Sequence, residues 1–169
     1  MTRNAFRTAA VFLATLAIPA TILATTRPAS ASDHMCETYG SNYCVGAPTL
    51  EPYQEVKETS TGRALTAHYL NQTFEGYAAY YLEFTTDTSL CVSTRDDLYQ
   101  YDTIVIHTCG DYGTVWALHP DSSGHLRWIN RYATNWYGAD VYLSGHNNGT
   151  QYRWDPWGVN GDYQRFDWK

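Results

Sequence analysis

Four cysteines are the residues whose type and spacing point most directly to a chemistry. They are Cys36, Cys44, Cys91 and Cys109, and an even number predicts two disulfides in a chain made for an oxidising compartment. Of the three possible pairings we favour Cys36–Cys44 with Cys91–Cys109, because each bridge then closes a local loop. A four-thiolate metal site is the alternative, but the spacings contain no C-x-x-C pair of the kind that such sites use.

The histidines and carboxylates form no pattern that is typical of an active site. No two histidines have the H-x-x-x-H spacing of a metal site, and no G-x-S-x-G motif of a nucleophilic serine occurs. A carboxylate pair for glycoside hydrolysis needs a defined separation in space, which a sequence does not supply. We therefore predict a protein that is not an enzyme and that uses no metal and no cofactor.

Residues 1–31 are predicted to be a secretory signal peptide that takes no part in the fold. Two early arginines precede an apolar stretch over residues 9–24, and a small-residue A-x-A site ends at Ala31. A membrane anchor is the alternative, but Pro19 interrupts the stretch, which is also shorter than the ~20 apolar residues of a span. We expect the rest, residues 32–169, to be a single secreted, extracellular domain.

The net charge of the expected mature domain restricts the classes of partner that it can bind. Residues 1–31 hold three arginines and no acids, so their removal takes the net charge from −6 to −9. An acidic surface repels phosphate groups, whether they belong to nucleic acid or to anionic lipid. We therefore expect neither a nucleic acid nor a membrane as partner.

The sequence of the expected domain, which holds all the candidate site residues, contains an internal repeat. Leu90–Thr94 is matched by Val141–Gly145, and Gly110–Tyr112 recurs as Gly161–Tyr163, with an offset of 51 residues both times. A fainter copy begins at Tyr43. A repeat of this period is one supersecondary unit that cannot bury its apolar face alone, so three units predict one domain with approximate threefold symmetry. The expected units span approximately residues 40–86, 87–137 and 138–169.

Strand-forming residues dominate the chain, and helix signals are nearly absent. Tyr, Thr, Val and Trp are abundant, and Gly, Asn, Asp and Pro clusters separate the runs that they form. The segment Leu65–Phe74 fits either a strand or a loop. The pattern favours an all-β barrel over a sandwich, because the repeat is threefold. The predicted strands are 77–84, 103–108, 115–119, 126–130 and 150–154, with hairpin turns at 120–124 and 146–149.

The order of motifs within the units resembles the ricin-type β-trefoil lectin family. A family repeat opens with Cys-Leu/Val-Asp, passes an Asn-Gly turn, reaches an aromatic residue and a second Cys, and closes on Gln-x-Trp. The resemblance covers Cys44 to Trp168 and implies a β-trefoil barrel of three repeats, with Cys91–Cys109 as a disulfide within one repeat. The motifs that carry it are Cys91-Val92-Ser93, the run Ile104–Cys109, Thr114-Val115-Trp116, Tyr142-Leu143-Ser144, Asn148-Gly149 and Gln164-Arg165-Phe166.

The resemblance also implies a sugar site in the last repeat. Trp154 stands at the position of the family's aromatic platform, next to Asp155, and Asn160 and Gln164 lie in the closing segment. An aromatic face with polar groups at its edge is what binds a sugar ring. Ser144 is a further expected ligand. The alternative is that Trp154 is a core residue.

The middle repeat provides a second candidate, with His107 at the platform position and Ser93 opposite. The alternative is that His107 is a half-buried strand residue. At the position of the family's pocket aspartate the chain has Gly46, Ser93 and Ser144, and serine lacks the two-oxygen reach of a carboxylate.

Two functions of different classes follow from these observations. The first is a non-catalytic binding module that recognises a carbohydrate through the last repeat. The second is a secreted protein-binding adaptor or inhibitor subunit, in which the sugar pockets of the same fold have degenerated. The missing pocket aspartates and the fifteen tyrosines favour the second.

Overall fold

The structure is a computed structural model, and it describes residues 33–38, 43–95, 103–145, 152–156 and 161–169. The predicted all-β character is confirmed for this part of the chain, while the expected signal peptide lies outside it. Its elements are β1 (Met35–Glu37), β2 (Cys44–Gly46), β3 (Lys57–Thr59), β4 (Leu65–Phe74), β5 (Tyr77–Phe84), β6 (Asp87–Thr94), β7 (Ile104–Thr108), β8 (Trp116–Leu118), β9 (Trp128–Asn130), α1 (Arg131–Tyr137), β10 (Val141–Ser144), β11 (Arg153–Pro156), the 3-10 helix η1 (Gly161–Gln164) and β12 (Phe166–Trp168).

The strand pairing follows one pattern three times along the chain. Strands β1, β2 and β3 pair in that order, as do β5, β6 and β7, and again β9, β10 and β11, all antiparallel. Cys91 and Tyr142, which occupy matching positions of the sequence repeat, lie on the middle strands of the second and third groups. Cys91 on β6 lies opposite Glu83 on β5, and Tyr142 on β10 lies opposite Ile129 on β9.

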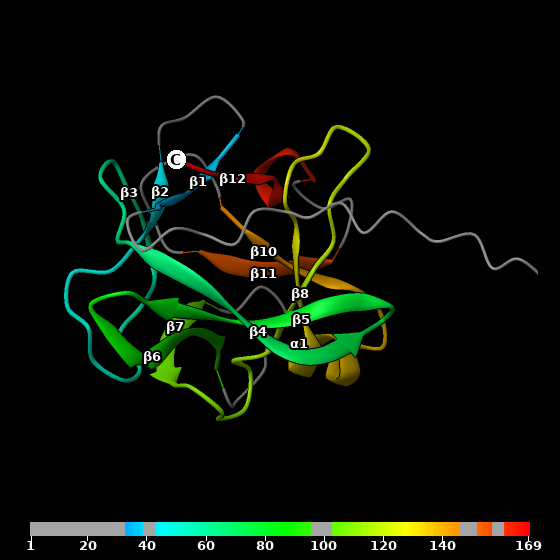
Figure 1. The fold of residues 1–169 in the computed structure, drawn as a ribbon, viewed down its shortest axis with the longest axis horizontal. Coiled ribbons are helices and arrows are strands. Elements are labelled where there is room, and N and C mark those ends of the chain that lie inside the picture. Colours follow the sequence, from blue (N-terminus) through cyan, green and yellow to red (C-terminus); the bar gives the residue numbers. More distant parts are fainter. Residues whose placement is uncertain (1–32, 39–42, 96–102, 146–151, 157–160) are drawn as a thin grey trace, which may run out of the picture.

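The remaining pairs join these three groups of strands to one another (Figure 1). Strand β4 pairs with β5, β8 with β9, and β12 with β1. Strand β5 also pairs with β8, and the bridges His34–Ala64 and Leu126–Phe166 link the segments at β1 and β4 and at β9 and β12. These pairs lead around a closed ring in the order β1, β4, β5, β8, β9, β12, which leaves those strands without a free edge.

The hairpin strands β3, β7 and β11 meet one another beside this ring. The bridge Glu55–Val105 joins the segment before β3 to β7, and the bridge Thr103–Arg153 joins the segment before β7 to β11. The third side is a hydrogen bond of 3.0 Å from the Tyr152 amide to the Val56 carbonyl. Strands β6 and β7 are therefore buried on both faces over most of their length.

The core is one cluster to which all three groups of strands contribute. Its largest wholly buried side chains include Trp116, Trp128 and Trp154. The Trp116 indole also donates a hydrogen bond of 2.7 Å to the Val92 carbonyl, which satisfies the one polar atom that its burial removes from water. Large aromatic side chains thus fill the space inside the ring.

Both predicted disulfides are confirmed. Cys36–Cys44 joins β1 to β2, and Cys91–Cys109 joins β6 to the residue that follows β7. The second bridge fixes the start of the loop that leads from β7 to β8.

Helix α1 is the main departure from the sequence-based expectation, which contained no helix. Asn130 caps its N-terminus by accepting a hydrogen bond of 3.0 Å from the Ala133 amide. Gly138 ends it in the left-handed conformation, at φ 79°. No helix in the described residues is long and apolar enough to cross a membrane.

Candidate ligand pocket

The side chains expected to bind sugar in the last repeat lie inside the molecule. Trp154, Asp155, Gln164 and Ser144 are all wholly buried, and Asn160 lies outside the described residues. The Gln164 amide donates to the Asp155 carbonyl at 3.3 Å, and the Ser144 hydroxyl donates to the Gly145 carbonyl at 3.3 Å. These groups are engaged with the main chain of the protein.

The platform role expected for Trp154 is therefore corrected. The rings of Trp136 and Tyr137, both on α1, pack against the Trp154 indole at centroid distances of 6.2 and 6.1 Å. A sugar ring would need the indole face that these contacts and the core already cover. Trp154 is a core residue, in agreement with the alternative reading of the sequence.

The second expected set, Ser93 and His107, is also largely buried. The Ser93 hydroxyl lies 2.8 Å from the Thr94 carbonyl and 3.1 Å from the Tyr112 carbonyl, so the chain itself occupies the place of a sugar hydroxyl. His107 forms an ion pair of 2.9 Å with Asp111, and the Tyr53 ring lies edge-on to its imidazole at 4.8 Å. Ser93 therefore positions the loop around Tyr112, and His107 is a strand residue beneath it.

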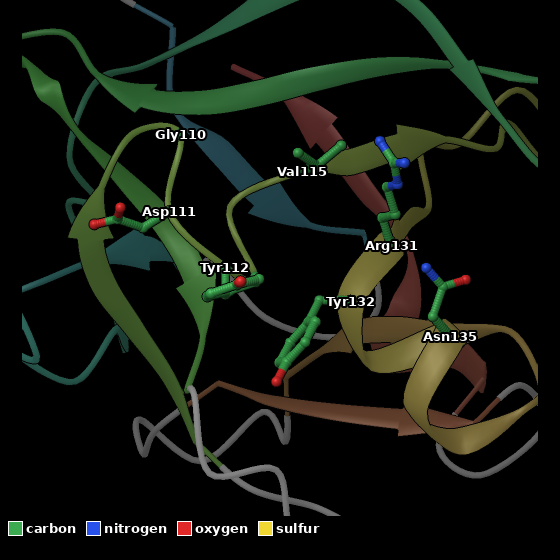
Figure 2. A pocket seen from close by; sticks show the side chains of 8 residues that line it. Gly110, Asp111, Tyr112, Val115, Arg131, Tyr132 and Asn135 are labelled. Carbon is green, nitrogen blue, oxygen red and sulfur yellow. The ribbon is translucent and has the colours of Figure 1, made fainter.

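A hollow of about 590 Å³ opens beside this loop, between the β7–β8 connection and helix α1 (Figure 2). Its volume lies within the range of small-molecule sites, roughly 300–1,000 Å³. The residues that line it are Gly110, Asp111, Tyr112, Gly113, Val115, Arg131, Tyr132 and Asn135.

The loop wall of the pocket is a compact turn. The Thr114 hydroxyl donates to the Asp111 carbonyl at 2.7 Å and accepts from the Gly110 amide at 3.2 Å. Gly113 has a φ of +80°, and a Cβ there would lie 2.7 Å from the Thr94 carbonyl oxygen and 2.9 Å from the Ser93 hydroxyl. Only glycine fits this position, so the loop passes close over β6 and turns Tyr112 outward.

Two hydrogen bonds fix the loop to the helix wall. The Asn130 side chain, besides capping α1, donates a hydrogen bond of 2.7 Å to the Gly113 carbonyl. The Arg131 amide donates to the Val115 carbonyl at 3.0 Å. The pocket therefore has two walls that cannot move apart without breaking buried hydrogen bonds.

The two tyrosines form the aromatic part of the pocket. Tyr112 is 73% exposed, and its ring centroid lies 5.5 Å from that of Tyr132 at an angle of 39°. Figure 2 shows both rings between the loop and the helix, with Arg131 and Asn135 on the helix side. An exposed ring beside hydrogen-bond donors is an arrangement that can stack on the apolar face of a ligand and bind its polar edge.

Sequence reasoning noticed Gly110-Asp111-Tyr112 as a repeat marker but did not predict this pocket. Three of its lining residues, Arg131, Tyr132 and Asn135, lie on the helix that was not expected. The available signal was the pair Asn130 and Gly138, which are a good N-cap and a good C-terminal residue for the segment between them.

Comparisons with known proteins give a fold neighbour and no family. No family model matches the chain, and no curated protein matches it. The chain is similar to part of a solved mosquitocidal holotoxin, with a TM-score of 0.63 and 13% sequence identity. The match covers 81% of this chain, which spans about 17% of the holotoxin. At this identity the likeness shows that the two chains share a fold.

Proposed function

We propose that the chain is a secreted, non-catalytic binding module with a β-trefoil fold, and that it recognises a carbohydrate at the pocket between Tyr112 and Tyr132. The threefold recurrence of the strand pairing supports the trefoil. Two disulfides support an oxidising, extracellular location, since such bonds are rare in the cytosol. The signal peptide over residues 1–31 is part of the same proposal.

The main observation in favour of a carbohydrate ligand is the exposure of the Tyr112 ring. Tyr112 is 73% exposed, and within the described residues its ring packs only against that of Tyr132, so most of its surface remains open to solvent. A pyranose ring has an apolar face that covers such an aromatic surface. Asn135 lines the same pocket, and its side-chain amide is a donor for a hydroxyl group.

The test is a comparison of Tyr112→Ala with Tyr69→Ala. Tyr69 on β4 is a matched control, because it is 49% exposed and its ring also lies 5.5 Å from a half-buried tyrosine, Tyr80. On a glycan array, with affinities then measured by calorimetry, we expect Tyr112→Ala to weaken binding about tenfold or more, as for a central aromatic contact. Tyr69→Ala should bind as the parent does.

Two results would contradict the proposal. One is a parent protein that binds no saccharide on a broad array. The other is binding that Tyr112→Ala leaves unchanged, which would place the saccharide elsewhere on the surface.

A protein-binding adaptor or inhibitor subunit is the second candidate, and the exposed end of α1 favours it. Trp136 is 55% exposed although its ring packs edge-on against buried Trp154. Exposed tryptophans supported by a rigid core are frequent anchors of protein interfaces. A stoichiometric protein partner in culture supernatant that Trp136→Ala releases, together with no glycan binding, would favour this function.

A further inference from the structure

The charge inside the pocket points to the chemical class of its ligand. Arg131 lines the pocket from the first position of α1, and its side chain forms no ion pair and no hydrogen bond within the described residues. Two other arginines of the described residues are engaged. Arg63 donates to the Ala47 carbonyl at 2.8 Å, and Arg165 pairs with Asp121 at 2.9 Å.

A role in helix stability does not account for Arg131. A cation at the start of a helix gains nothing from the peptide dipoles, which favour acids there. The chain as a whole carries a net charge of −6, so acids for pairing are abundant elsewhere on its surface. An uncompensated guanidinium that lines an aromatic pocket of an acidic protein is therefore suited to an anionic ligand.

The one carboxylate at the pocket does not neutralise Arg131. Asp111 pairs instead with His107 at 2.9 Å, and Figure 2 shows its carboxylate directed away from the rings of Tyr112 and Tyr132. Asn135 lies one helical turn after Arg131 and lines the same wall, so its amide adds a neutral donor beside the cation.

We propose that this pocket takes an acidic saccharide, in which a hexuronate carboxylate is held by Arg131 while the sugar ring lies against Tyr112. The inference rests on the proposed carbohydrate-binding function and specifies its ligand. A planar guanidinium matches the two oxygens of a carboxylate, which makes the contact both strong and directional. The neutral donor of Asn135 is then available to a ring hydroxyl.

The test compares two ligands that differ only in charge, a galacturonate oligosaccharide and its carboxyl-reduced neutral counterpart. Each is titrated by calorimetry into the parent protein and into Arg131→Gln, Arg153→Gln and Tyr112→Ala. Arg153 on β11 is the matched control, because it is an exposed arginine that does not line the pocket. Poly-glutamate serves as a polyanion that contains no sugar.

We expect the parent to prefer the acidic oligosaccharide by about tenfold or more at low salt, as for a hydrogen bond between charged groups. Arg131→Gln should lose this preference while it keeps the affinity for the neutral form, and Arg153→Gln should behave as the parent does. Added salt should weaken acidic binding by the parent more than by Arg131→Gln.

The possible failures are distinguishable. If the parent binds both oligosaccharides equally and Tyr112→Ala still weakens this binding, the preference for an acidic ligand is refuted. The carbohydrate-binding function is then retained. If poly-glutamate binds as tightly as the acidic sugar, the claim that the ligand is a saccharide is refuted, and the pocket is a simple anion site. Acidic binding that Arg131→Gln leaves unchanged overturns the role of Arg131, and no binding of any saccharide overturns the function itself. Thermal unfolding of each variant excludes a folding defect as the cause of a loss.

Discussion

At the scale of single residues, His119 connects three segments that are far apart in the sequence. The Tyr77 hydroxyl lies 3.0 Å from its Nε2 atom, and the Tyr142 hydroxyl lies 3.1 Å from its Nδ1 atom. The Tyr142 hydroxyl also donates to Asp140 at 3.4 Å, so Nδ1 is the donor to Tyr142 and Nε2 accepts from Tyr77. Burial raises the pKa of Tyr142 to about 12, which keeps this hydroxyl protonated. The network thus fits a neutral imidazole.

This network predicts a loss of stability in mild acid. Burial, and then the positive charge of Arg127, lower the pKa of His119 below its ordinary value of 6.5. The unfolded chain therefore binds more protons than the folded one as the pH falls through 6.5, and the free energy of unfolding falls with it. Urea unfolding at pH 7.5 and at pH 5 should show this decrease, and His119→Gln should reduce it. A decrease that His125→Gln removes instead would contradict the assignment to His119, because His125 lies in a separate, half-buried pair with Asp167.

At the scale of elements, Asn130 joins the two walls of the pocket without lining it. Its side chain caps α1 at Ala133 and donates to the Gly113 carbonyl at 2.7 Å, and it is wholly buried. We expect Asn130→Ala to lower the free energy of unfolding by about 2 kcal/mol, because a cap is lost and a buried carbonyl is left without its donor. Urea unfolding measures this change.

Asn130→Ser separates the two roles. Serine is also a good cap, but its side chain is too short to reach Gly113, so the helix should be retained while the loop is released. Saccharide affinity should then fall, and the free energy of unfolding should fall by less than in Asn130→Ala, because the cap is kept and only the donor to the Gly113 carbonyl is lost. Asn135→Ala is the control within the same helix, where an exposed substitution should stay within about 0.5 kcal/mol of the parent. Equal stability of Asn130→Ala and the parent would refute the coupling of loop and helix.

Strand elements could be predicted from the sequence more readily than the site. The run Tyr77–Phe84 is rich in tyrosine and contains no Gly, Pro, Asn or Asp, which favours a strand, and β5 has the same bounds. Helix α1 has seven residues, which is too short for a clear helical period, so its caps were its main signal. This one omission accounts for both errors at the site. The helix covers Trp154, which was expected to be open, and forms the wall of a pocket that was not expected.

At the scale of the whole molecule, the spacing of the cysteines in the sequence was enough to predict the two disulfides. The exposure of individual side chains could not be predicted in this way, because it depends on how distant segments pack. Cys91 lies opposite His107 in the β6–β7 pair and Cys109 directly follows β7, so this bridge stays within one pair of neighbouring strands. The burial of Trp154 depends instead on packing with other segments, among them Trp136 on the helix between β9 and β10. A sequence read in short windows contains the first kind of information and not the second.

The two disulfides should contribute unequally to the stability of the folded domain. A bridge restricts the unfolded chain, and the loop closed by Cys91–Cys109 spans 18 residues against 8 for Cys36–Cys44. The loop-entropy relation gives about 3 kcal/mol for the first and about 2.5 kcal/mol for the second. Guanidinium unfolding of the paired alanine variants should therefore show the greater loss for the Cys91 and Cys109 pair.

The same pair of variants also distinguishes stability from binding. Cys109 directly precedes Gly110, so the loss of its bridge should loosen the loop that presents Tyr112, whereas the loss of Cys36–Cys44 acts far from that loop. Under conditions where both variants are folded, saccharide affinity should fall only in the variant without Cys91–Cys109. A fall of equal size in both variants would mean that the pocket depends on the rigidity of the whole molecule and not on its own loop.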